Sequence, residues 1–254
     1  MMGRAHLMVG TAGWLTVGVG GLEMAGHSLS IPEIAAGTVV CAGAAMLPDL
    51  DHPQATAARS LGPVTGVLSK ALNTAAGGHR QGSHSLLFAL GAAFGTAWLL
   101  AATSGPWAAL LLCFFFSSLA LRVLTEASGL ISAGLAGIVA ATLISLAPEA
   151  DWLWLAIGIG CLLHMLGDIL TPEGVPPLWP VSGWRFRFPI IGHTGDWRES
   201  IIAGACGLLT LVLITTTVFI PLWSKSGTTE VEARETNPPA KQKQASPKNS
   251  AKLF

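Results

Sequence analysis

Apolar residues occur along the chain in long runs, and short polar stretches separate them. The runs cover residues 6–22, 31–47, 84–103, 106–124, 129–147, 152–171 and 201–223. Several approach the roughly 20 residues that an α-helix needs to cross the hydrocarbon core of a bilayer. The pattern therefore predicts an all-α, polytopic transmembrane helical bundle of about six or seven spans. The first two runs are short and rich in Gly and Ala, so a re-entrant or tightly packed hairpin is the alternative for them.

The composition supports a membrane protein. Apolar residues make up 51% of the chain and charged residues only 11%, well below the roughly 25% of soluble domains. Fourteen Lys and Arg balance fourteen Asp and Glu, so the net charge gives no support for a nucleic-acid partner. The four cysteines lie singly inside apolar runs, which favours neither a thiolate metal site nor a disulfide framework.

The end of the chain differs from the rest. Residues 224–254 are rich in Lys, Pro, Ser, Gln and Glu, and they contain too few apolar residues to fold alone. We therefore predict a membrane-embedded domain over residues 1–223 and a disordered C-terminal tail over residues 224–254.

Alternate crossing of the predicted spans places most of the polar groups on one side of the membrane. This side holds the start of the first span, the polar stretches 48–83 and 172–200, and the Lys and Arg residues that precede the tail. The positive-inside rule makes it the cytoplasmic side. The lysines of the tail argue against this orientation, because seven spans would place them outside.

Histidines and carboxylates cluster at span ends on this side. His164 and Asp168 are four residues apart and share a helix face, so the pair can bind one metal ion; a hydrogen bond between two buried polar groups is the alternative. Asp49 and Asp51 follow Pro48, and their carboxylates suit divalent ions. A turn at the helix end explains one aspartate, but not both with His52 beside them.

A third cluster precedes the third span. His79 and His84 flank Arg80, and an arginine near a helix N-terminus attracts phosphate. This segment is expected to supply metal ligands and an anion contact; the alternative is a polar cap closed by Ser83, with solvated histidines. The predicted ligands of a divalent cation (Zn, Mn or Mg) are His6, Asp49, Asp51, His79, His84, His164 and Asp168. They exceed the needs of one ion, which suggests two.

The stretch 172–200 allows two interpretations. Its arginines and tryptophans are residue types that anchor a protein in the headgroup layer, which is the favoured interpretation. Alternatively, the stretch forms a flap over the site, in which Arg185 or Arg187 binds an anionic substrate.

These motifs, taken in order, resemble the YdjM-like family of bacterial inner-membrane proteins, which are grouped as membrane-bound metal-dependent hydrolases. The matching pieces are His6, the Pro48 to His52 run, the His79 to Ser85 segment, the His164, Asp168, Thr171 and Gly174 series, and the Thr194 to Glu199 stretch. Ser83 stands where a threonine is common in the family. The resemblance implies a helical membrane fold and a divalent metal.

The expected function is hydrolysis at the membrane surface by a metal-activated water. Asp51 or Asp168 would act as general base, and Arg80 would stabilise developing negative charge. The lipid bilayer is the expected partner, with a phosphoester or lipid-linked substrate; the sequence does not indicate an oligomeric state. The rival hypothesis is a non-enzymatic metal transporter, sensor or scaffold that uses the same ligands. Clusters close to one membrane surface and apolar span centres favour chemistry over transport.

Overall fold

The computed structural model describes residues 1–126 and 129–220, and it confirms the all-α prediction. The principal helices are α1 (Gly3–Gly13), α2 (Gly20–Met24), α3 (Ile31–Ala44), α4 (Pro63–Ala76), α5 (Leu86–Ala102), α6 (Trp107–Thr125), α7 (Gly129–Leu146), α8 (Leu153–Ile169) and α9 (Trp197–Ile214). A π-helical segment, η1 (Trp14–Val19), joins α1 to α2, and another, η5 (Thr215–Phe219), follows α9. Three 3₁₀ turns are η2 (Pro48–Asp51), η3 (Ala57–Arg59) and η4 (Gly82–His84). Within the described ranges no β-strand forms; only an isolated bridge pairs Val175 with Phe186.

Within the described residues, each predicted apolar run is helical over most of its length. Among the described residues, five helical segments are long and apolar enough to cross a membrane: Gly3–Met24, Ile31–Asp51, Trp107–Thr125, Gly129–Leu146 and Trp197–Thr217. The first two runs are among them, so each can cross independently. The apolar helices α5 and α8 are shorter, at 17 residues each, or about 25 Å at 1.5 Å per residue. These two short helices carry or adjoin three of the predicted site residues.

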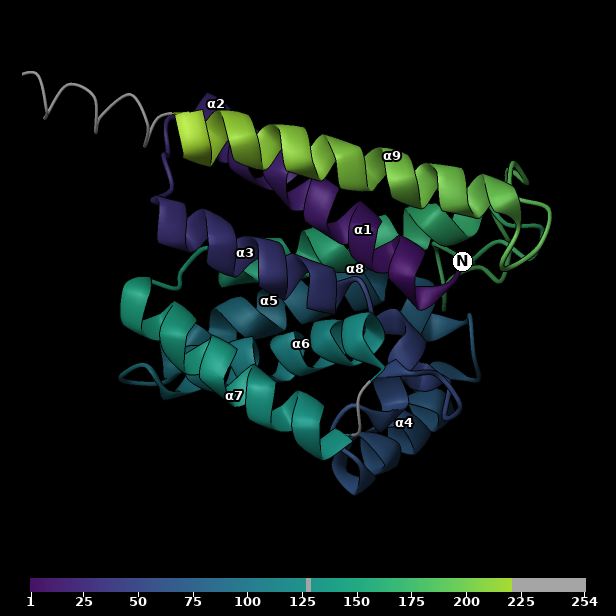
Figure 1. Cartoon of the computed structure of the whole chain (residues 1–254). Coiled ribbons are helices and arrows are strands. Elements are labelled where there is room, and N and C mark those ends of the chain that lie inside the picture. The colour runs from purple at the N-terminus through teal and green to yellow at the C-terminus, as the bar shows by residue number, and fades with distance from the viewer. Residues whose placement is uncertain (127–128, 221–254) are drawn as a thin grey trace, which may run out of the picture. The chain divides into compact units, whose positions relative to one another are not determined.

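Helix α3 lies at the centre of the bundle, where it packs against α1, α6 and α8 (Figure 1). Helix α8 also packs against α5, and α6 packs against α7. The close approach of α3 and α8 depends on a glycine: a Cβ atom at Gly160 would lie 2.6 Å from the carbonyl oxygen of Cys41. Helix α9 runs beside α1, with the hydroxyl oxygens of Thr11 and Thr210 3.3 Å apart.

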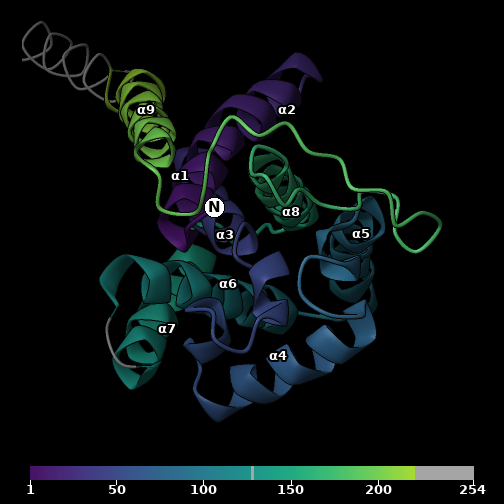
Figure 2. The ribbon, with the colours of Figure 1, turned by 90° about the vertical axis from the view of Figure 1, so that its right-hand side faces the viewer.

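Helix α4 is the element that the sequence pattern did not predict, because residues 48–83 were expected to be a polar stretch between spans. In Figure 2 α5, α8 and α9 are seen nearly end-on, whereas α4 runs across the view. Pro63 occupies its first turn, and Gly77 caps its C-terminus with a φ of 78°. A proline at the start and a left-handed glycine at the end are ordinary helix boundaries, so local signals for this helix were present.

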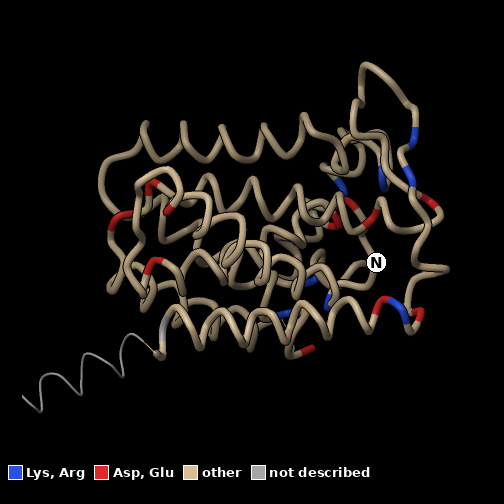
Figure 3. The backbone as a smooth tube through the Cα atoms, turned by 90° about the horizontal axis from the view of Figure 1, so that it is seen from above, with Lys and Arg blue, Asp and Glu red and all other residues tan. Residues whose placement is uncertain are grey.

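Lysine and arginine gather toward the end of the bundle that carries the label N, whereas the charged residues described at the opposite end are acidic (Figure 3). The chain divides into two compact units, Met1–Leu213 and Ile214–Phe254. The predicted domain boundary at residue 223 and the predicted disordered tail, 224–254, lie outside the described residues.

Candidate metal centre

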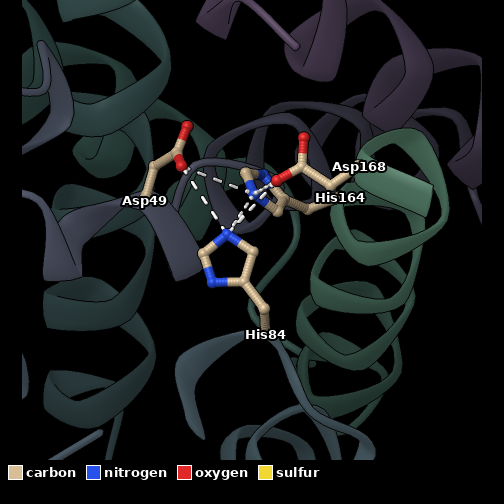
Figure 4. Close-up of side chains that lie close together, drawn as sticks. All are labelled: Asp49, His84, His164 and Asp168. Carbon is tan, nitrogen blue, oxygen red and sulfur yellow. Dashed lines mark hydrogen bonds and ion pairs between the residues drawn. The ribbon is translucent and has the colours of Figure 1, made fainter. Parts of the chain in front are cut away.

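Four side chains from three separate segments converge on one buried point (Figure 4). Asp49 comes from η2, His84 from η4, and His164 and Asp168 from the last turns of α8. One ligand atom from each residue lies within 4.8 Å of all the others. Among the described residues this is the one group of three or more His, Cys, Asp or Glu that meets that criterion.

The spacing of these atoms suits a small cation. His84 Nε2 lies 3.1 Å from His164 Nε2 and 3.4 Å from Asp168 Oδ2. His164 Nε2 lies 3.6 Å from both Asp168 Oδ2 and Asp49 Oδ1, and His84 Nε2 lies 3.8 Å from Asp49 Oδ1. A tetrahedral zinc site with bonds of about 2.0–2.1 Å separates its ligand atoms by about 3.3–3.4 Å. Five of the six donor pairs are therefore within about half an ångström of this spacing, and the sixth, Asp49 with Asp168, lies within 4.8 Å.

Hydrogen bonds orient both imidazoles. His164 Nδ1 donates to the carbonyl oxygen of Ala45 at 2.6 Å, so Nε2 of the neutral ring carries the lone pair that faces the donor group. Ala45 is the C-cap residue of α3, where carbonyl groups lack partners within the helix. His84 Nδ1 lies 3.0 Å from Ser83 Oγ, and Ser83 donates to Asp51. Ser83 can thus accept from Nδ1–H, which leaves Nε2 of His84 for a metal ion.

One carboxylate oxygen of Asp168 has the surroundings of a metal ligand. Its Oδ2 atom is buried and accepts no hydrogen bond, although Arg80 Nε lies 3.3 Å away. Its Oδ1 atom accepts from Arg80 Nη2 at 3.3 Å and from the amino group of Met1 at 2.7 Å. Buried polar atoms without partners are rare in folded proteins. An oxygen of this kind, aimed at two imidazole nitrogens, fits a metal ligand.

Electrostatics in the metal-free site favour a proton on His84. Burial alone would lower its pKa, but Asp168 and Asp49 outweigh this effect and raise the pKa to about 9. A positively charged group is thus favourable between the two carboxylates. A divalent cation would replace that proton.

His6 packs against His164 and Asp168, two of the four donors. Its ring stacks on His164 with centroids 3.8 Å apart, and its Nε2 is 3.2 Å from Asp168 Oδ1. A Cβ atom at Gly167 would lie 3.1 Å from the His6 ring, so the glycine leaves space for it. The structure therefore places His6 against two of the donors but outside the group that could hold one ion.

Asp51 also lies outside the four-donor group. Its fully buried carboxylate accepts from His79 Nδ1 at 2.6 Å, from the backbone N–H of Arg80 at 3.2 Å and from Ser83 Oγ. Asp51 thereby holds the segment that carries His84. The cap by Ser83 that the alternative interpretation assumed does not form: Ser85 is the N-cap of α5 and accepts from Phe88 N.

An open polar pocket of about 350 Å³ adjoins the site, and it is lined by His79, Arg80, Glu173 and Arg185. Arg80 connects it to the donors, because its guanidinium contacts Asp168 and also lies 2.8 Å from Glu173 Oε2. Arg185 donates to the carbonyl oxygens of Glu173, Gly174 and Arg80 at 3.2–3.3 Å. The contact of Glu173 with Arg80 was not predicted, because it joins segments that are far apart in the sequence.

Comparison with known proteins identifies relatives. The sequence model of the YdjM inner membrane protein family matches residues 1–227. Inner membrane protein YdjM of Escherichia coli (strain K12) and its namesake in Shigella flexneri are each 50% identical to this chain over 48 residues. That alignment covers 18% of this chain and 24% of each relative. No solved structure matches.

Proposed function

The chain belongs to the YdjM inner membrane protein family, and from this premise we propose that it is a membrane-bound, metal-dependent hydrolase. The four-donor group of Asp49, His84, His164 and Asp168 carries the proposal. Two imidazoles and two carboxylates suit Zn or Mn better than Mg, which keeps several waters and prefers oxygen ligands. A second ion, expected from the number of candidate ligands, remains a prediction.

A divalent cation held by these residues would supply Lewis-acid polarisation and would lower the pKa of a bound water toward about 7. Asp49 is the donor nearest to solvent, since its side chain is 20% exposed whereas those of His84, His164 and Asp168 are closed off. Substrate therefore approaches the site from the Asp49 side.

Arg80 is assigned to the substrate anion. Its guanidinium lies between Asp168, a donor, and the open pocket that Arg185 also lines. A planar guanidinium binds phosphate oxygens with two parallel hydrogen bonds. Glu173 is exposed and occupies one side of Arg80, so a substrate phosphate would displace its carboxylate. These contacts favour a phosphoester, including a lipid-linked one.

His79 is assigned to proton transfer rather than to metal ligation. His79 Nδ1 lies 2.6 Å from Asp51 Oδ1. The His79 side chain is 32% exposed and lines the polar pocket. A carboxylate that fixes one imidazole nitrogen leaves the other free to accept or donate a proton. In this proposal Asp51 positions His79 and is not the general base itself.

The site is proposed to face the cytoplasm, because the basic residues gather at its end of the bundle. Transport is the weaker proposal. Along the buried side of α8, the residues between the site and the opposite end are apolar, Gly or Cys: Leu153, Ala156, Ile157, Gly158, Ile159, Gly160 and Cys161. A route for an ion needs polar groups, which this side of α8 does not offer.

The test compares purified full-length wild type with His164→Ala and with His27→Ala. His27 is an exposed histidine that lines a different pocket, with Glu33 and Glu149. Metal content is measured by mass spectrometry, and hydrolysis is measured on a panel of aryl phosphodiesters and phospholipid vesicles. We expect His164→Ala to lose both the metal and the hydrolysis, and His27→Ala to keep both. Metal binding without hydrolysis of any member of the panel would favour a transporter or sensor.

A further inference from the structure

The unpredicted helix α4 has its apolar side outward. Its outer face consists of Val64, Val67, Leu68, Ala71 and Ala75, which are all exposed. Val64 is 69% exposed and Val67 is 70% exposed. A helix on the surface of a soluble protein has the reverse arrangement, with its apolar stripe on the core. This outer face therefore requires an apolar environment outside the chain.

The inner face of α4 is polar and belongs to the protein. Thr65 and Ser69 are buried, and Asn73 Nδ2 donates to the carbonyl oxygen of Asp51 at 2.8 Å. The helix packs on η2, the turn that carries Asp49 and Asp51. The exposed position of the apolar side chains is thus fixed by specific polar contacts on the other side.

The orientation of α4 excludes a membrane crossing. It has 14 residues, or about 21 Å at 1.5 Å per residue, against a hydrocarbon core of about 30 Å. It lies across the direction of α5, α8 and α9 (Figure 2). Gly62 and Gly77, with φ of 59° and 78°, turn the chain at its two ends. A helix that crosses the bundle axis at one end of a set of spans lies parallel to the membrane plane.

The outer face of α4 is continuous with a surface that faces lipid. An apolar pocket of about 190 Å³ lies between α4 and α5, and its lining includes Leu72, Ala75, Leu87, Phe88 and Trp179. Leu86, Leu87 and Leu90 at the start of α5 are exposed as well. Since α5 is an apolar helix packed within the bundle, we expect its exposed leucines to face acyl chains.

We propose that α4 is an in-plane membrane helix whose outer face inserts at the boundary between headgroups and acyl chains. Lipid is the occupant, because the spans already place this end of the bundle at a membrane surface and the apolar face continues onto α5. Lys70 is exposed at the polar edge of the outer face, where its ammonium can reach lipid phosphates. The proposal does not depend on catalysis. If α4 lies in the membrane surface, its Asn73 contact with Asp51 sets how deep in the membrane the Asp49–Asp51 turn lies.

The test uses the full-length protein in phospholipid nanodiscs, with the photoreactive residue p-benzoylphenylalanine at position 67. Leu208 of α9, which is 64% exposed, is the lipid-facing control, and Gln54, exposed in the turn before α4, is the aqueous control. After illumination, mass spectrometry counts phospholipid adducts. We expect position 67 to match position 208 within about twofold and to exceed position 54 about tenfold.

Two outcomes would overturn the proposal. A lipid yield at position 67 no higher than at position 54 would place the outer face in water. Adducts to a second copy of the chain or to another protein, in place of lipid, would make it a protein-binding surface. The same probe at position 64 repeats the test at a second outward position, so one poorly folded variant does not decide the result.

Discussion

Asp51→Asn separates a residue that positions the metal site from one that binds the ion. In the structure the Asp51 carboxylate accepts hydrogen bonds from His79, from the backbone of Arg80 and from Ser83. An asparagine keeps one acceptor oxygen but replaces the other with an NH₂ group, which cannot accept from these donors. At least one buried hydrogen bond to a charged group is lost, which costs about 1.5–3 kcal/mol of stability.

The effect on metal binding follows from the chain of contacts. Asp51 holds Ser83, and Ser83 Oγ lies 3.0 Å from His84 Nδ1, so the change loosens the orientation of one donor without removing it. Loss of such an outer contact typically weakens metal affinity about 10–100-fold, or about 1.4–2.7 kcal/mol.

The assay is a competition titration of Zn²⁺ between a chromophoric chelator and full-length protein in detergent. Asp49→Asn is the matched variant, because it changes the same side chain two residues away but removes a donor. We expect Asp51→Asn to bind Zn²⁺ at the four-donor group with an affinity about 10–100-fold below wild type. We expect Asp49→Asn to bind no stoichiometric Zn²⁺ in competition with the chelator. Equal losses in both variants would refute the assignment, since Asp51 would then be a ligand itself. An unchanged affinity in Asp51→Asn would refute the argument that it positions His84.

Three further predictions follow from the same geometry. Because the pKa of His84 is raised to about 9, its imidazole is protonated at pH 7 in the metal-free site. Zn²⁺ binding should therefore release about one proton and strengthen as pH rises toward 9; calorimetry in buffers of different ionisation enthalpy measures this release, and a heat independent of buffer would contradict it. Gly160→Ala should destabilise the protein by about 1–3 kcal/mol, because the new Cβ meets the carbonyl of Cys41. Gly137→Ala, where a Cβ meets open space, is the control, and equal thermal unfolding of the two variants would count against close packing of α3 and α8. Arg80→Lys should retain the metal but reduce hydrolysis about 10²–10³-fold; an unchanged rate on the best substrate of the panel would remove Arg80 from anion stabilisation.

The spans were predictable because the length of an apolar run is read directly from the sequence. The pairing of His164 with Asp168 was also predictable, since residues four apart share a helix face. The roles of Asp49 and Asp51 were not. In the 3₁₀ turn that holds them, with three residues per turn, side chains two residues apart point in directions about 120° apart around the axis. One carboxylate therefore faces the donor group and the other faces the His79–Ser83 segment.

Helix α4 was missed for a related reason. An apolar run of span length predicts a membrane helix, whereas α4 is short and mixes valine and leucine with threonine, serine and asparagine. Its polar residues bind protein and its apolar residues face outward, so polarity alone suggested a solvated loop. The contacts of Arg80 with Asp168 and Glu173 also lay beyond sequence reasoning, because they depend on how the segment before α5 packs against the end of α8.

X-ray absorption at the metal edge of the purified full-length protein tests the central claim most directly. The account predicts a divalent ion in the four-donor group, with a first shell of nitrogen and oxygen atoms at about 2.0–2.2 Å and the outer-shell scattering of two imidazoles. His164→Ala should reduce the imidazole contribution or remove the ion. A protein that carries no ion after zinc loading, or an ion whose spectrum is the same in wild type and His164→Ala, would contradict it.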